Sequence, residues 1–159
     1  VWGKFINGGQ TCIAPDYVLI NKSVKEDFVK YMKEQITEAY GENPENSDDF
    51  PRIVNQRNFD RLHKMLINES FLTGGKTNRD ECYISPTLLD EPSLESEVMK
   101  GEIFGPILPL ISSVLNVKFS CGNFRIPFQA KKFVEVNPIT DLFKGTFTQI
   151  DLHHSSLPC

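Results

Sequence analysis

Long apolar runs are absent from this sequence of 159 residues. Its apolar stretches, such as residues 18–20 and 107–110, fall far short of the ~20 residues that a helix needs to cross a bilayer. The first residues also lack a basic region followed by an apolar one, so they carry no recognisable secretory signal. The chain begins with Val1 rather than methionine, and we therefore expect its natural start to lie upstream. We predict a cytoplasmic protein and leave membrane association of the intact protein open.

Cysteines are few and the net charge is small. The four cysteines, Cys12, Cys82, Cys121 and Cys159, lack the close spacing of a zinc site or a redox motif. They are also sparse for a disulfide scaffold, so we predict reduced thiols and no metal site. The net charge of −4 argues against nucleic acid as the main partner.

The composition changes near residues 112 and 113. Acidic side chains outnumber basic ones before this point, and basic ones outnumber acidic ones after it. Half of the phenylalanines lie in the short stretch that follows. We therefore predict one folded region over residues 1–112 and a divergent tail of unknown structure over residues 113–159.

Helical signals mark three segments of the front region. A short helix is predicted to end at the double glycine of residues 8–9. Ser23 and Glu26 have the spacing of a capping box, which predicts a helix that starts at Ser23. Apolar residues follow at helical spacing as far as Gly41, which ends this helix. The same spacing predicts a further helix over about residues 55–68.

Short β-favouring runs separate these helices. Residues 17–20, 71–73, 83–89 and 107–111 are each predicted to form a strand. Pro86, inside the third run, predicts an edge strand or a bulge. Strands that alternate with helices indicate an α/β fold with a largely parallel sheet.

One segment combines a thiol with a glycine-rich turn. Residues 5–15 read Phe-Ile-Asn-Gly-Gly-Gln-Thr-Cys-Ile-Ala-Pro. The double glycine allows a sharp turn and a close approach of the backbone to a ligand. A thiol after such a turn can face a cleft, with backbone N–H groups nearby to receive an oxyanion. From the residues alone, a buried structural cysteine is the more common alternative.

The segment around Cys12 resembles the active-site signature of the aldehyde dehydrogenase superfamily, in which Gly-Gln-x-Cys surrounds the nucleophile. Residues 102–106, Glu-Ile-Phe-Gly-Pro, resemble a second motif of that family, Glu-x-Phe-Gly-Pro. The separation of the two motifs, and Ala-Pro-Asp-Tyr after the cysteine, resemble the class 3 or fatty aldehyde dehydrogenase branch. The resemblance covers residues 1–112. It implies part of the three-layer α/β catalytic domain of the family, without the dinucleotide-binding domain.

The resemblance also implies a role for three residues. Cys12 would be the nucleophile that forms a thiohemiacetal with the aldehyde and then a thioester, which water hydrolyses. Glu102 would accept hydrogen bonds from the nicotinamide ribose of NAD or NADP, and Phe104 would pack beside the nicotinamide ring. Without the resemblance, Glu102 would be a solvated carboxylate and Phe104 a core residue. The substrate implied is a small-molecule aldehyde, and the intact family member is implied to be a homodimer.

Several parts of the family pattern are not found in this sequence. The glycine-rich cofactor turn, the glutamate that serves as general base and the asparagine of the oxyanion hole all lie upstream of the cysteine in the family. Residues 114–159 do not resemble the family's own C-terminal part. We therefore expect the parent protein to be an enzyme and the isolated chain to be nearly inactive.

Two other functions stay open at this point. The first is a non-catalytic fragment that associates with full-length subunits, because an incomplete fold leaves apolar surface uncovered. The second is a hydrolase, because a nucleophilic cysteine can cleave activated esters without a dinucleotide.

Overall fold

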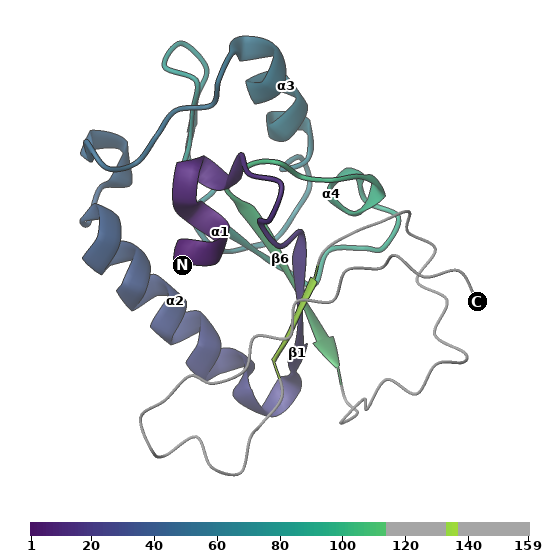
Figure 1. Cartoon of the computed structure of the whole chain (residues 1–159). Helices are drawn as coiled ribbons and strands as arrows, with labels where there is room; N and C mark the ends of the chain where they lie inside the picture. The colour runs from purple at the N-terminus through teal and green to yellow at the C-terminus, as the bar shows by residue number, and fades with distance from the viewer. Residues whose placement is uncertain (114–132, 137–159) are drawn as a thin grey trace.

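A five-stranded sheet forms the centre of the protein. The computed structural model describes residues 1–113 and 133–136, and Figure 1 shows their arrangement. The strand order is β2-β5-β6-β1-β7. The strands are β1 (Tyr17–Asn21), β2 (Phe71–Thr73), β5 (Thr87–Asp90), β6 (Ile107–Ser113) and β7 (Phe133–Val136). All neighbours are parallel except β2 and β5, which are antiparallel. The predicted α/β fold with a largely parallel sheet is confirmed.

Helices cover both faces of this sheet, which gives the three layers that the resemblance implied (Figure 1). The α-helices are α1 (Trp2–Phe5), α2 (Lys25–Tyr40), α3 (Gln56–Lys64) and α4 (Glu97–Lys100). Short 3₁₀ turns are η1 (Ile6–Gly9), η2 (Lys22–Val24) and η3 (Pro44–Asn46). Among the described residues, none of these helices is long and apolar enough to span a membrane.

The alternating direction of side chains along the strands divides the hydrophobic core into two clusters. Val18 and Ile20 of β1 pack in one cluster with Met32 and Ile36 of α2. Tyr17, from the opposite face of β1, joins a second cluster, whose members from the helices are Phe59 and Leu62 of α3 and Val98 and Met99 of α4. Successive side chains of a strand point to opposite faces, so a single strand anchors both helical layers.

The start of α2 differs from the prediction. Asn21, rather than Ser23, supplies the capping oxygen, which accepts a hydrogen bond of 3.0 Å from the Ser23 N–H. Ser23 lies inside η2, and α2 begins two residues later with no side-chain cap. The predicted capping box at Ser23 and Glu26 is therefore wrong, because the strand ends in a 3₁₀ turn before the helix starts. Gly41 follows the last residue of α2, as predicted.

The predicted strand over residues 83–89 is divided at Pro86. Residues Tyr83–Ile84 form β4, which pairs with β3 (Thr77–Asn78) in a separate two-stranded sheet. Beyond Pro86, the Thr87 N–H donates to the Pro106 carbonyl and β5 joins the main sheet. Proline has no N–H to donate, so the chain changes partners at this residue.

The predicted helix over residues 55–68 is shorter in the structure. α3 ends at Lys64 and is followed by a turn in which Asn68 has a φ of 63°. Asn55 caps its start by accepting a hydrogen bond of 2.9 Å from the Asn58 N–H.

The division of the chain near residue 112 stays a prediction. β6 continues to Ser113, and β7 adds a strand from the second region to the sheet.

Candidate active site

A left-handed turn precedes Cys12. Asn7, Gly8 and Gly9 have φ values of 51°, 61° and 71°, a region that favours glycine and tolerates asparagine. Gly9 also lies against a second segment. A Cβ built on Gly9 would lie 2.2 Å from the Gly105 carbonyl oxygen, closer than any real contact. The turn therefore requires glycine for both its conformation and its packing.

Gln10 ties the turn to the segment before α3. Its Nε2 donates to the Arg52 carbonyl at 3.1 Å, and its Oε1 accepts from the Val54 N–H at 3.0 Å. Two residues further on, Cys12 is exposed and its thiol is free. The Oγ1 of Thr11 is buried with no hydrogen-bond partner among the described residues. Buried hydroxyls rarely lack a partner. The turn therefore places an unusual buried hydroxyl next in sequence to the exposed thiol.

The second motif packs directly on this turn. Gly105 lies so close to α3 that a Cβ built on it would be 2.5 Å from Leu62 Cδ2. Before it, Phe104 has a φ of 49° and a side chain that is 40% exposed. Glu102 is also exposed. The contact between Gly9 and Gly105 thus brings the predicted residues Cys12, Glu102 and Phe104 onto two adjoining segments.

Arg61 of α3 binds three successive carbonyls of the second motif. Its Nη2 donates to the Ile103 carbonyl at 2.7 Å and the Phe104 carbonyl at 3.5 Å, and its Nη1 donates to the Glu102 carbonyl at 3.4 Å. Burial lowers the pKa of Arg61 from its ordinary value, and the negative charge of Glu102 opposes that shift. The guanidinium of arginine is not deprotonated in proteins. The motif is therefore held by a permanent cation.

Two buried charged residues lie beneath the two segments. Lys4 is 3% exposed and donates from Nζ to the Pro15 carbonyl at 2.8 Å. Asp16 is 2% exposed and accepts from the Ile103 N–H at 2.8 Å. Burial lowers the pKa of Lys4 to about 8, and the charges of Asp16 and Glu102 oppose that shift. Sequence reasoning did not find Asp16 or Arg61 because their partners lie far along the chain. It did not find Lys4 because its bond to Pro15 crosses the folded turn around Cys12.

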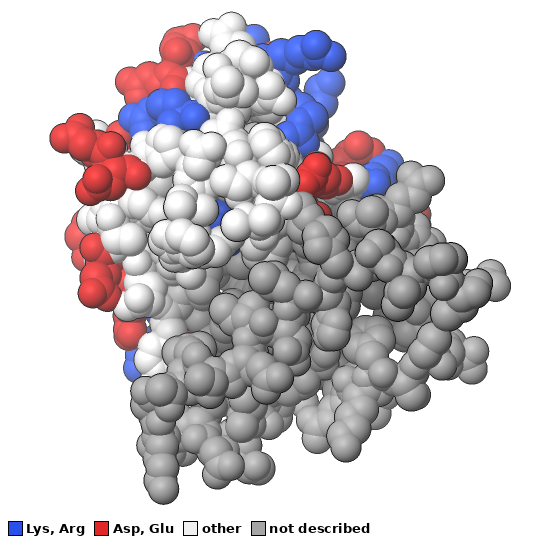
Figure 2. Space-filling model, viewed as in Figure 1, with Lys and Arg blue, Asp and Glu red and all other residues white. Residues whose placement is uncertain are grey.

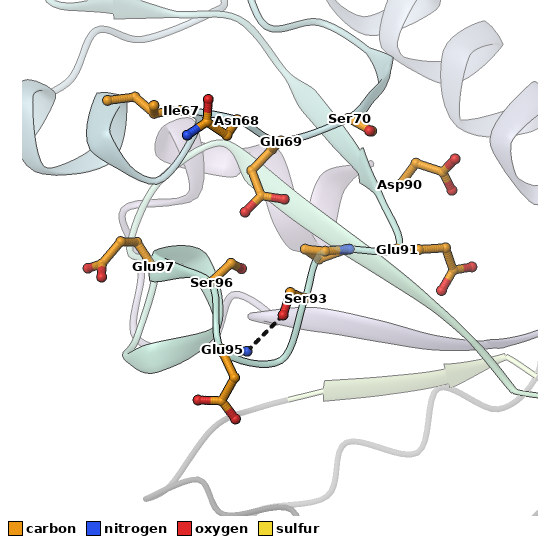
Figure 3. A pocket seen from close by; sticks show the side chains of 11 residues that line it. Ile67, Asn68, Glu69, Ser70, Asp90, Glu91, Ser93, Glu95, Ser96 and Glu97 are labelled. Atoms are coloured by element: carbon orange, nitrogen blue, oxygen red, sulfur yellow. Dashed lines mark hydrogen bonds between the residues drawn. The ribbon is translucent and has the colours of Figure 1, made fainter.

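A separate pocket lies elsewhere on the molecule, between the loop after α3 and the segment that leads to α4. Its volume is about 410 Å³, and its lining includes Glu69, Glu91, Glu95 and Glu97 but not Cys12. Figure 3 shows Glu95 and Glu97 pointing away from each other. No group of three acidic, histidine or cysteine side chains among the described residues could hold a metal ion. The predicted residues Cys12, Glu102 and Phe104 lie in the two motif segments and not in the lining of this pocket.

Comparison with known proteins gives a consistent result. The family model described as "Aldehyde dehydrogenase family" matches residues 1–114. The aldehyde dehydrogenase family 3 member A2 of Rattus norvegicus is 45% identical over 117 residues, which are 74% of this chain and 24% of that protein. The dimeric NADP-preferring aldehyde dehydrogenase of Rattus norvegicus is 41% identical over 110 residues, or 69% of this chain and 24% of that protein.

Solved structures show the same relationship. The substrate-bound structure of Staphylococcus aureus AldH is similar, with a TM-score of 0.68 and 44% identity, over 70% of this chain and 25% of that one. The chain thus spans about a quarter of the length of each of these three relatives.

Proposed function

The chain belongs to the aldehyde dehydrogenase family, and on that premise we propose that it carries the nucleophile and part of the cofactor contact of an enzyme that oxidises aldehydes to carboxylic acids with NAD or NADP. One observation carries the proposal. The Gly9–Gly105 contact joins the turn that presents the exposed thiol of Cys12 to the segment that presents Glu102 and Phe104. The contact requires glycine at position 9, and the packing of the second segment on Leu62 requires glycine at position 105. Both glycines lie inside the family's motifs.

Cys12 would begin the reaction. Its thiolate adds to the aldehyde carbon and the carbonyl oxygen becomes the oxyanion of a thiohemiacetal. A hydride then leaves that carbon, so the carbon is oxidised to a thioester. Water attacks the thioester, the carboxylic acid departs, and the Cys12 thiol is restored. The thiolate suits both steps because it is a strong nucleophile and its thioester remains hydrolysable.

Glu102 and Phe104 would contact the nicotinamide part of the dinucleotide, which accepts the hydride when it is bound. The residues present fit that role, because the Glu102 carboxylate and the Phe104 ring are both exposed beside the Cys12 turn. Glu102 would accept hydrogen bonds from the ribose hydroxyls, and Phe104 would pack against the ring. Arg61, which binds the carbonyls of both residues, would keep their backbone in place.

The relatives support a proposal for the substrate class, cofactor and partners of the whole protein. We propose a medium-chain, long-chain or aromatic aldehyde as the substrate, as the resemblance of the motifs to the class 3 or fatty aldehyde dehydrogenase branch implies. One relative is named as dimeric and NADP-preferring. This name supports NADP as an alternative to NAD, and a homodimer as the form of the intact protein. A cytoplasmic location stays a prediction.

The isolated chain is proposed to be nearly inactive as a dehydrogenase. It matches a quarter of its relatives' length. The general base that the family resemblance places upstream of the cysteine has no counterpart in these 159 residues. Loss of one such proton-transfer group typically lowers a rate by ~10²–10⁴-fold.

A second candidate is a non-catalytic fragment that associates with full-length subunits. Trp2, at the start of α1, and Ile13, next to Cys12 in the chain, are 70% and 60% exposed. Figure 2 shows that the surface over α1 and the segment leading to β1 carries few charged side chains. Exposed apolar surface of this kind favours contact with another protein. Co-purification with an intact homologue, lost on Trp2→Glu and Ile13→Glu substitution, would support this candidate.

Hydrolysis of 4-nitrophenyl acetate tests the proposed nucleophile. We expect the pure chain to release nitrophenolate at a rate that Cys12→Ala abolishes and Cys82→Ala preserves, with or without NAD. Adding an aldehyde and NAD to the same chain should give no NADH. An unchanged rate in Cys12→Ala would remove Cys12 from the proposal, and NADH formation would contradict the inactivity of the isolated chain.

A further inference from the structure

The junction between the two motif segments has a buried amine at its base. Lys4 lies on α1, and its Nζ donates to the carbonyl of Pro15, three residues beyond Cys12. Its own backbone carbonyl oxygen is 3.0 Å from the position of a Cβ built on Gly9. Lys4 therefore contacts the Cys12 segment twice. Its backbone carbonyl lies against Gly9, before the thiol, and its side chain bonds to Pro15, after the thiol.

Asp16 continues this link to the second motif. Its buried carboxylate accepts the Ile103 N–H, and its charge acts on the Lys4 amine together with that of Glu102. A run of contacts thus passes from Lys4 to residues 15–16 and from Asp16 to residue 103. The Gly9–Gly105 contact closes the junction from the other end.

We propose that Lys4 is a positioning residue that holds the Cys12 segment against the Glu102–Phe104 segment, and that this junction tightens when Lys4 loses its proton. The inference rests on the proposed function for the roles of Cys12, Glu102 and Phe104. It concerns the geometry of the junction, which is measured without any catalytic reaction.

The direction of the pH effect follows from burial. Desolvation lowers the pKa of Lys4 from 10.5 to about 8 in the folded protein. An opened junction exposes the amine to water and returns its pKa toward the ordinary value, so the opened state binds more protons between these two values. Proton linkage then disfavours opening by up to about tenfold for each pH unit above 8. Below pH 8 the amine is protonated in both states, and its effect on opening is constant.

Four other titrating groups of the described residues lie near Lys4 or near its partner Asp16. Asp16 and Glu102 are the carboxylates that act on its charge. Tyr17 lies near Asp16, and burial raises its pKa to about 12, so it stays neutral over the range of interest. The amino group of Val1 lies at the start of α1, and burial lowers its pKa below the ordinary 8.0. Removing Lys4 alone separates its titration from all of these.

Amide hydrogen exchange of the full chain between pH 7 and 9.5 tests the proposal, with each rate divided by its intrinsic chemical rate. The reporter is the Ile103 amide, which donates to Asp16. In the unsubstituted chain we expect the normalised rate to be flat up to about pH 8 and then to fall by about tenfold per unit. Lys4→Met should give a flat profile throughout. Lys33→Met, which removes an exposed lysine of α2, should keep the profile of the unsubstituted chain.

A flat profile in the unsubstituted chain, or equal pH dependence in Lys4→Met, would overturn the proposal. If Lys4→Met fails to fold by circular dichroism, the profile of the unsubstituted chain decides alone. Cys12→Ala should leave the exchange profile unchanged. The failure of Cys12 as a nucleophile and the failure of Lys4 as a positioning residue are therefore distinguishable.

Discussion

At the scale of single residues, Gly9 is the residue on which the proposed site depends most. Its φ of 71° costs any L-residue conformational energy, and its missing side chain lets the Gly105 carbonyl approach. The family signature places a glycine here, and the sequence alone predicts only that the backbone turns sharply. The contact with Gly105 could not be predicted locally, because it joins segments that meet only in the folded protein.

Gly9→Ala is expected to disrupt this junction. The new Cβ would lie 2.2 Å from the Gly105 oxygen, so the two segments must separate. We expect the free energy of unfolding to fall by about 1–3 kcal/mol, the usual cost of a strained backbone. Cys12-dependent ester hydrolysis should fall more than the fraction of unfolded protein explains. Urea denaturation and the nitrophenyl acetate assay measure the two effects.

Gly3→Ala is the matched control for this prediction. No atom lies within 4 Å of a Cβ built on Gly3, which is exposed in α1. Alanine favours a helix over glycine by roughly 0.5–1 kcal/mol, so this change should keep or raise stability and preserve the hydrolysis rate. Equal behaviour of the two variants would remove the Gly9–Gly105 contact from the account.

At the scale of secondary-structure elements, α3 supports the second motif. Leu62 packs against Gly105, and Arg61 donates to the three carbonyls of residues 102–104. A short helix therefore sets the position of a segment that has no regular structure of its own. Asn55 fixes the start of this helix through its cap.

Arg61→Met is expected to release the Glu102–Phe104 segment. The substitution keeps part of the apolar stem but leaves carbonyl groups without their donor, which typically costs about 1–3 kcal/mol. We expect a lower urea midpoint and faster hydrogen exchange at residues 102–105. Arg57→Met, an exposed arginine of the same helix, should change neither. Unchanged exchange in Arg61→Met would show that the segment holds its shape without α3.

Sequence reasoning predicted elements better than their ends and connections. Apolar spacing identified α2, because Met32 and Ile36 lie on its buried face. The same reasoning placed its cap at Ser23, because a capping-box spacing does not reveal the 3₁₀ turn that follows β1. Pro86 predicts an edge strand or a bulge, whereas the structure divides the strand there between two sheets. The Thr87 N–H beyond it bonds to the carbonyl of Pro106, which lies far along the chain.

The candidate site was predictable only in part. The positions of Cys12, Glu102 and Phe104 came from the resemblance of two motifs, and their assigned roles stay predictions. Lys4 and Asp16 are charged residues in a buried junction, a placement that hydrophobic patterning argues against. Their burial depends on hydrogen bonds to Pro15 and Ile103. Sequence spacing gives no sign of these bonds.

At the scale of the whole molecule, the chain is a three-layer α/β unit that corresponds to a quarter of its relatives. Its described part contains the two motif segments and the helix that supports them. Under the proposed mechanism, it has a nucleophile but no counterpart of the family's general base. A thioester should therefore form on Cys12 faster than it is hydrolysed.

Trapping that thioester tests whether the Gly9–Gly105 junction presents Cys12 as a nucleophile. The chain is mixed with 4-nitrophenyl acetate, quenched in acid within seconds, digested, and mapped by mass spectrometry for acetylated cysteine. We predict that acetyl accumulates on Cys12 and not on Cys82, which is half-buried against the core. Comparable acetylation of the two thiols, or none on Cys12 in a chain shown to be folded, would contradict the claim that the Gly9–Gly105 junction presents Cys12 as a nucleophile.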